Sequence, residues 1–304
     1  CLVGSEMCIR DSVILKPTTF KQDEILMSAR SFGGTSTVAD VNDLPSAQFA
    51  TEIIEFCGIG DFSLTELQKA LTGKYVSVSP SISSTTDAMS GSSNIKDLET
   101  MLQLNYLYFT APRRDEKAFE ALKGIMATQL KNKEANPKYA WSDSIQMMAT
   151  NNSPRTILQD EKMLAAVDMD KAIAFYKQRF ANPADFTFFF TGNIDPADPA
   201  FQKMVCTWIG GMKTTKKHES FVDNNVRVTP GIQKNYFTRE MHTHTASNFI
   251  QYTSYDIPYT IENMLNMRMI GRILSTRYLE SIREREGGSY LSLIHISEPT
   301  RQAE

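Results

Sequence analysis

Apolar and polar positions follow two different periods along the first two thirds of the chain. Alternating stretches rich in β-prone residues predict strands at residues 13–17, 24–30, 74–84 and 186–191. Apolar residues at helical spacing predict helices at residues 47–56, 64–71, 95–109, 115–133, 141–148, 160–180 and 200–209. Strand pairs and helices in this order predict an α+β fold. It would be a sandwich with helices packed on one face of a mostly antiparallel sheet.

Several helix ends carry local signals. Ser63 precedes a helix and Glu66 follows three residues later, which is the pattern of a capping box. Gly58 is placed to end the helix before it. Asn94 and Asp97 can cap the first turn of the helix that we expect from residue 95.

The pattern changes after residue 209. Residues 210–235 are rich in Gly, Lys, Thr, Asn and Asp and have no apolar period, which predicts an interdomain linker. A strand at residues 249–255 and a helix at 262–286 follow, and another strand starts at Ser289. The core stripe predicted for this helix consists of Met267, Ile270, Leu274, Tyr278 and Ile282.

Composition narrows the class of protein. The chain has 304 residues, with 41% apolar and 22% charged residues, so it can build packed cores over more than one domain. Its net charge of −3 gives no reason to expect a nucleic acid as partner. Its longest apolar runs are too short to span a membrane.

The two ends differ from the rest of the chain. Residues 1–12 (CLVGSEMCIRDS) and 292–304 (SLIHISEPTRQAE) resemble translated read-through of sequencing adapters, although they could also be ordinary tails. We therefore divide the chain into a domain at residues 13–209, the linker at 210–235 and a second, partial domain at 236–291.

The histidines do not form a recognisable zinc site. A hydrolytic zinc is commonly held by two histidines on one helix face, in the motif H-x-x-E-H or its reverse, with a glutamate as base. The four histidines, which form neither motif, are His218, His242, His244 and His295. His242 and His244 would share one face of a strand. No Asp, Glu or Cys stands at a comparable spacing, so a solvated strand face explains the pair better than a metal site.

The segment from Arg283 to Tyr290 is the sharpest candidate for binding chemistry. Arg283 lies in the last turn of the predicted helix, two glycines permit a reversal, and Tyr290 starts the next strand. A guanidinium and a phenol held together could hydrogen-bond a peptide carbonyl and the oxyanion formed from it. The alternative is that Arg283 complements the helix dipole and Tyr290 fills a core.

Five segments together resemble the second half of an M16 (pitrilysin/insulinase-type) zinc metallopeptidase. They are residues 26–34 (LMSARSFGG), 64–78 (LTELQKALTGKYVSV), 97–113 (DLETMLQLNYLYFTAPR), 186–195 (FTFFFTGNID) and 273–290 (ILSTRYLESIREREGGSY). The resemblance implies four similar α+β domains in two halves that close around a peptide. The first half would carry H-x-x-E-H, and the last domain would supply an Arg and a Tyr that hold the substrate.

The resemblance assigns roles to particular residues. Arg283 and Tyr290 match the substrate-binding pair, while Phe49, Glu52 and Ile53 stand where the zinc motif would be. Residues 13–209 would thus be a degenerate third domain that lacks metal ligands, and 236–291 part of the fourth. No catalytic residue is expected in this chain, and we expect it to be inactive alone.

The implied function is the non-catalytic, substrate-binding C-terminal part of a zinc metalloendopeptidase, with zinc only in the full-length enzyme. Its partners would be a peptide substrate and the N-terminal catalytic half of the same protein or a separate catalytic subunit. The alternative is a stand-alone binding or scaffold subunit that pairs with an active M16 chain. The resemblance also points to the bacterial cell envelope or periplasm.

Overall fold

The computed structural model describes residues 12–134, 136–215, 219–240, 249–253, 257–281 and 293–296. The chain forms two compact units. Unit 1 comprises Cys1–Asn132 and Ile157–Asn225, and unit 2 comprises Lys133–Thr156 and Val226–Glu304. Within the described ranges, no helix combines the length and the hydropathy that crossing a membrane requires.

Unit 1 is built on a five-stranded sheet with the strand order β1-β5-β2-β4-β3. The strands are β1 (Ser12–Pro17), β2 (Ile25–Phe32), β3 (Val76–Ile82), β4 (Thr86–Ser93) and β5 (Thr187–Gly192). Only β1 and β5 pair in parallel, whereas the other three pairings are antiparallel. The predicted α+β class with a mostly antiparallel sheet is confirmed.

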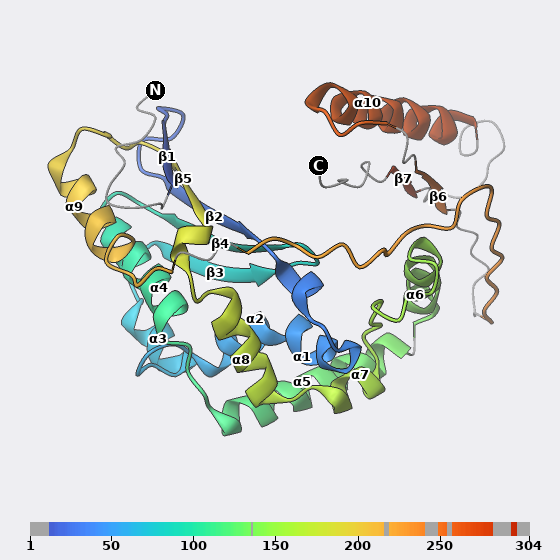
Figure 1. Ribbon diagram of the computed structural model, residues 1–304, viewed down its shortest axis with the longest axis horizontal. Helices are drawn as coiled ribbons and strands as arrows, with labels where there is room; N and C mark the ends of the chain where they lie inside the picture. Colours follow the sequence, from blue (N-terminus) through green and yellow to red (C-terminus); the bar gives the residue numbers. More distant parts are fainter. Residues whose placement is uncertain are drawn as a thin grey trace. The chain divides into compact units, whose positions relative to one another are not determined.

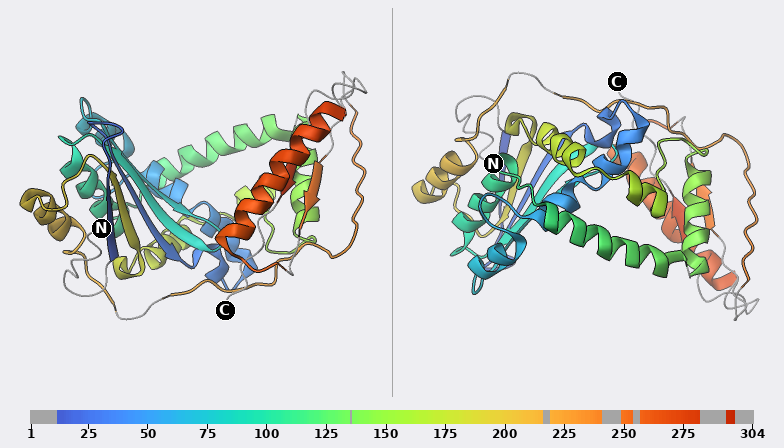
Figure 2. Two further views of the ribbon diagram at one scale, coloured as in Figure 1. Left: turned by 90° about the horizontal axis from the view of Figure 1, so that it is seen from above. Right: turned by 90° about the horizontal axis from the view of Figure 1, so that it is seen from below.

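Helices cover one face of this sheet (Figures 1 and 2). The helices around the core include α2 (Ala50–Cys57), α4 (Leu98–Thr110), α8 (Met169–Arg179) and α9 (Pro199–Trp208). The others that begin in unit 1 are α1 (Leu44–Gln48), α3 (Leu64–Ala70), α5 (Glu116–Glu134) and α7 (Glu161–Ala166). The described part of the unit also has the 3-10 turns η1 (Gly34–Thr37), η2 (Val41–Asp43) and η3 (Pro183–Asp185).

The core of unit 1 lies between the sheet and these helices. Alternate residues of β2 and β5 are buried, as the period of two predicts, and Met27, Phe188 and Phe190 are at most 2% exposed. The ring of Phe109 from α4 makes edge contacts with Phe180 and Phe186, with centroids 5.3 and 5.0 Å apart. This aromatic cluster holds the helix layer against the sheet.

The helix ends follow the local signals. Ser63 accepts a hydrogen bond from the Glu66 amide and its own amide donates to the Glu66 carboxylate, which completes the capping box. Gly58 ends α2 with φ of 93°, and a Cβ built there would lie 2.1 Å from the Phe62 carbonyl oxygen. Asn94 accepts a hydrogen bond of 2.7 Å from the Asp97 amide, which caps the turn before α4.

Two elements of unit 1 differ from the prediction. β4 was not predicted, since its sequence TDAMSGSS is polar and rich in small residues. In the sheet, β4 buries Asp87, Met89 and Gly91 on the core side between two other strands. The single helix predicted at 160–180 is also wrong, because the chain turns at Val167 and starts α8 anew with Asp168 as N-cap.

Unit 2 contains α6 (Pro137–Ala149), α10 (Ile261–Tyr278) and a parallel pair of strands, β6 (Phe249–Tyr252) and β7 (Leu293–Ile296). The predicted core stripe of α10 is not buried over Met267, Ile270, Leu274 and Tyr278, and Ile270 is 46% exposed. Two strands of four residues are too small to cover an 18-residue helix. Ile282 lies outside the described residues.

Candidate functional site

The position expected for a zinc motif lies at the start of α2 and cannot hold a metal. Phe49 and Ile53 are 4% and 0% exposed, and both side chains belong to the hydrophobic core. Neither offers a donor atom to zinc, so the residues at this position do not fit the metal. No group of three His, Cys, Asp or Glu side chains that could hold a metal exists among the described residues.

Glu52 supplies a carboxylate where the motif H-x-x-E-H has its glutamate, but the two histidines of the motif are missing. It lies at the exposed surface of α2. Its pKa is raised, first because the surrounding protein removes part of its hydration and second because Glu55 carries a like charge. Glu55 accepts a hydrogen bond of 2.6 Å from Ser79 at the edge of the sheet. With no ligands beside it, Glu52 is a surface carboxylate.

The other candidates named from the sequence lie mostly outside the described residues. This holds for Arg283 and Tyr290 and for three of the four histidines, His218, His242 and His244. The fourth, His295, is described only by its backbone in β7. Substrate binding by Arg283 and Tyr290 therefore stays a prediction.

The helices of unit 1 leave the other face of the sheet uncovered (Figure 2). We call its residues the open sheet face. They are Ile14, Lys16, Leu26, Ser28, Arg30, Phe32, Ser77, Ser79, Ser81, Thr86, Ala88, Ser90, Ser92, Thr187, Phe189 and Thr191, the residues that alternate with the buried ones.

Register divides this face into an apolar side and a hydroxyl side. Ile14 pairs with Phe189, and Phe189 also pairs with Ser28, which continues through Ser90 to Ser79. One row across all five strands thus begins with two apolar side chains and ends with three serines. In the next row Leu26 lies beside Thr191 and Ser92, and Ser92 pairs with Ser77.

The apolar side chains of this face remain accessible. Ile14 is 47% exposed, Leu26 45% and Phe189 38%. The serine side has short side chains that can both donate and accept hydrogen bonds, and Ser77 and Ser92 already bond each other at 2.8 Å. Such a surface can contact an extended chain through apolar side chains and through its backbone.

A buried polar cluster lies on the opposite, helix-covered side of the sheet. Arg179 from α8 donates to the Asp87 carboxylate at 3.1 and 2.8 Å and to the Phe32 carbonyl at 3.1 Å. The two side chains are 1% and 0% exposed. Burial raises the pKa of Asp87, while Arg179 and the Gly34 amide act against that rise.

Arg179 also fixes the beginning of the segment that we predicted as a linker. It donates to the Glu219 carboxylate. The Val222 amide donates to Ser36 at 2.9 Å, and the Asn224 side chain donates to the Ser36 carbonyl at 2.9 Å. Within unit 1, residues 219–224 are thus held by side-chain contacts instead of a helix or strand.

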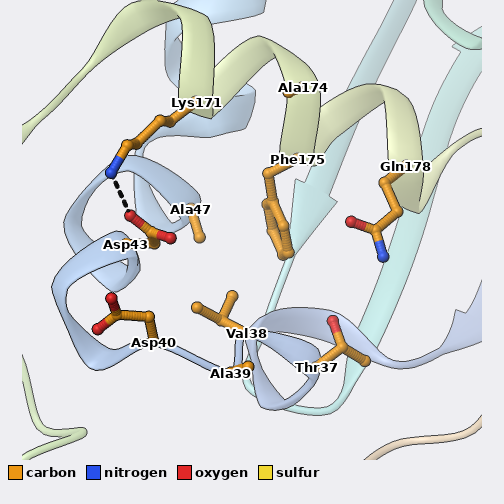
Figure 3. Close-up of a pocket in the computed structure, with 10 residues that line it drawn as sticks. All are labelled: Thr37, Val38, Ala39, Asp40, Asp43, Ala47, Lys171, Ala174, Phe175 and Gln178. Atoms are coloured by element: carbon orange, nitrogen blue, oxygen red, sulfur yellow. Dashed lines mark hydrogen bonds and ion pairs between the residues drawn. The ribbon is translucent and has the colours of Figure 1, made fainter.

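A pocket of about 390 Å³ opens beside α8 (Figure 3). Its middle is apolar, with Val38 facing Phe175, while Lys171 and Asp43 form an ion pair of 2.6 Å at one end. The remaining lining residues are Thr37, Ala39, Asp40, Ala47, Ala174 and Gln178. Among the described residues, no third ligand type joins its two carboxylates, Asp40 and Asp43, so this lining holds no metal site for peptide hydrolysis.

The open sheet face was missed from the sequence as a site, although part of its signal is visible there. Ser77 and Ser79 alternate with apolar residues in the strand that we predicted at residues 74–84. The two serines opposite them belong to β4, which was not predicted. The buried pair Arg179 and Asp87 gives no local signal, because 92 residues separate them.

The sequence of the chain is similar to those of two zinc proteases. No protein-family model matches the chain. The chain is 22% identical over 308 residues to "Zinc protease PQQL-like" of Arabidopsis thaliana, and the match covers 96% of this chain and 29% of that protein. It is 22% identical over 244 residues to "Probable zinc protease PqqL" of Escherichia coli, with coverage of 79% and 26%. The chain thus spans less than a third of these relatives.

Solved structures share the fold at low identity. The periplasmic protease PqqL from Escherichia coli matches 91% of this chain and 30% of its own, with a TM-score of 0.66 and 19% identity. A peptidase M16 inactive domain from Pseudomonas fluorescens matches 90% and 65%, with a TM-score of 0.59 and 12% identity. The sequence matches and the shared fold agree with the resemblance found in the sequence. The chain is therefore similar to a part of the M16-type zinc peptidases, in sequence and in fold.

Proposed function

We propose that this chain is the non-catalytic, substrate-binding part of a zinc metalloendopeptidase, and that its open sheet face forms part of the wall that meets the peptide. The observation that carries the proposal is this face itself. It is five strands wide, uncovered by the helices of unit 1, and combines exposed Ile14, Leu26 and Phe189 with a serine side.

The absence of metal chemistry at α2 supports the non-catalytic role. Phe49 and Ile53 fill the core where zinc ligands would stand, so no hydrolytic step is assigned to this chain. We assign the zinc and the base to an H-x-x-E-H motif in the first half of the whole peptidase. Arg283 and Tyr290 would hold the substrate near that metal.

The same proposal covers organisation and location. Residues 13–209 would be a degenerate third domain, 210–235 a linker and 236–291 part of a fourth domain. A place in the bacterial envelope is supported by the periplasmic protease PqqL, with which this chain shares its fold.

Site-specific cross-linking tests the proposal. A photoreactive p-benzoylphenylalanine at Ser90, on the open sheet face, is compared with the same group at Lys203, an exposed position of α9. The probe is fluorescein-labelled lactalbumin, reduced and carboxymethylated so that it stays unfolded. We expect cross-linking from position 90 and little from position 203. Equal cross-linking from both positions, or none from either, would refute the proposed substrate face.

A further inference from the structure

The open sheet face carries positive charge without any negative side chain. Lys16 and Arg30 are its charged residues, and both are exposed. Among the residues that the structure describes, neither makes an ion pair. No Asp or Glu belongs to the face, and Glu55 of α2 reaches it only at the β3 edge, through Ser79. The whole chain has a net charge of −3, so this face differs in sign from the chain as a whole.

The two cations flank the apolar side of the face. In the register of the sheet, Arg30 lies in the row of Thr187, whereas Lys16 lies in the row of Thr191. Four residues along a strand separate these rows, which corresponds to about 13 Å, and β5 lies between the two strands that carry the cations, so the two Cα atoms are roughly 16 Å apart. Ile14 and Phe189 occupy the row between them.

The spacing of the rows matches an extended peptide, and the long side chains of Lys16 and Arg30 can span the sideways offset between their strands. Alternate side chains of a strand point to one side, so residues i, i+2 and i+4 of a peptide face the sheet together over about 13 Å. An apolar side chain at i+2 would reach Ile14 and Phe189. Acidic side chains at i and i+4 would then lie near Arg30 and Lys16.

We infer that the open sheet face selects acidic, extended polypeptide segments in which an apolar side chain lies between two carboxylates. The inference rests on the proposed function and names the substrate class of the same face. A basic segment would bring like charges to Arg30 and Lys16 with no carboxylate of the face to receive them. The serines of the hydroxyl side can hydrogen-bond to a polypeptide backbone of any sequence. Selection among peptides therefore comes from the charges of Lys16 and Arg30.

The expected selectivity is modest and depends on salt. An exposed ion pair changes a binding constant by only about 1.4- to fivefold, so two pairs give about two- to twenty-five-fold. Added salt reduces this advantage, because both cations are exposed to solvent.

Three matched peptides test the inference on the full 304-residue chain. The acidic peptide is acetyl-Gly-Ser-Glu-Ser-Leu-Ser-Glu-Ser-Gly-amide, and the other two replace both glutamates by glutamine or by lysine. Amide chemical shifts report the site of binding, and titrations at low salt give the affinities. We expect shifts at Ile14 and Phe189, with affinity falling in the order glutamate, glutamine, lysine.

Variants separate this inference from the proposed function. The double change Lys16→Gln and Arg30→Gln should abolish the preference for glutamate, whereas Lys203→Gln on α9 should preserve it. Equal affinities for all three peptides, with shifts at Ile14 and Phe189, would overturn the charge selection and leave the substrate face intact. Shifts confined to other parts of the chain would overturn both.

Discussion

The buried pair of Arg179 and Asp87 makes a sharp prediction about the stability of unit 1. The change Arg179→Met keeps a long apolar side chain in α8 but removes the guanidinium. Asp87 then loses its hydrogen bonds of 3.1 and 2.8 Å, and the Phe32 carbonyl loses a donor at 3.1 Å. Asp87 Oδ1 already has no hydrogen-bond partner among the described residues, so little remains to solvate the carboxylate.

The size of the effect follows from burial. Removing one partner of a buried ion pair costs about 3–5 kcal/mol, because the other charge stays buried without compensation. The two side chains are 1% and 0% exposed, so solvent screening does not reduce this figure much. For a unit of this size, each kcal/mol lowers the melting temperature by about 2–4 °C. We therefore expect a fall of roughly 6–20 °C.

The loss should depend on pH. The pKa of Asp87 in the folded chain is raised above its ordinary value by burial, and Arg179 opposes this rise. Without Arg179 the pKa rises further, so the folded variant binds a proton that the unfolded chain releases. Its stability therefore falls as pH rises through the folded pKa. The melting temperature of Arg179→Met should lie further below the wild type at pH 8 than at pH 5.

Thermal unfolding followed by circular dichroism measures these differences. Lys171→Met serves as the control, because Lys171 belongs to α8 and forms an exposed ion pair with Asp43, whose loss should leave the melting temperature unchanged. Adding Asp87→Asn to Arg179→Met should recover stability at pH 8 by removing the buried charge. A fall of less than about 2 °C for Arg179→Met, or no recovery in the double variant, would refute the reasoning.

Three further changes test individual features of unit 1. Gly33→Ala should lower the melting temperature and weaken the Arg179 contacts, because a Cβ there would lie 1.9 Å from Arg179 Nη2 and φ is 140°; an unchanged melting temperature would contradict this. Ser63→Ala should cost about 0.5–2 kcal/mol in chemical denaturation. The Ser63 hydrogen bonds lower the pKa of Glu66, so their contribution to the free energy of unfolding should be lost as pH falls through that pKa. An equal loss of stability in Ser63→Ala at neutral and at low pH would contradict this. Ile53→His should destabilise the chain without creating zinc affinity in calorimetry, and stoichiometric zinc would show that the position can hold a metal.

Periodicity and caps made much of unit 1 predictable. β5 reads TFFFTG, and its buried phenylalanines alternate with exposed residues, as a strand with one covered face requires. Ser63 and Glu66 marked a helix start within four residues of sequence. Both signals depend only on residues that are close in sequence, so the sequence alone was enough to predict these two elements.

Elements stabilised by distant contacts were harder to predict. β4 contains small polar residues that a loop would also use, and it is a strand because β2 and β3 pair with it on both sides. From the sequence alone, Arg179 is only a cation in the last turn of a helix. Its role depends on Asp87, on a strand that the sequence did not reveal. The open sheet face was missed for the same reason, since three of its serines and threonines lie in β4.

Peptide cleavage by the purified chain tests the central claim most directly. The chain is incubated with excess zinc and an unfolded, fluorescently quenched casein substrate. We expect no cleavage above the background, because apolar Phe49 and Ile53 stand where the zinc-binding histidines would be and leave Glu52 without a metal to act with. Cleavage that a chelator abolishes and zinc restores would contradict it.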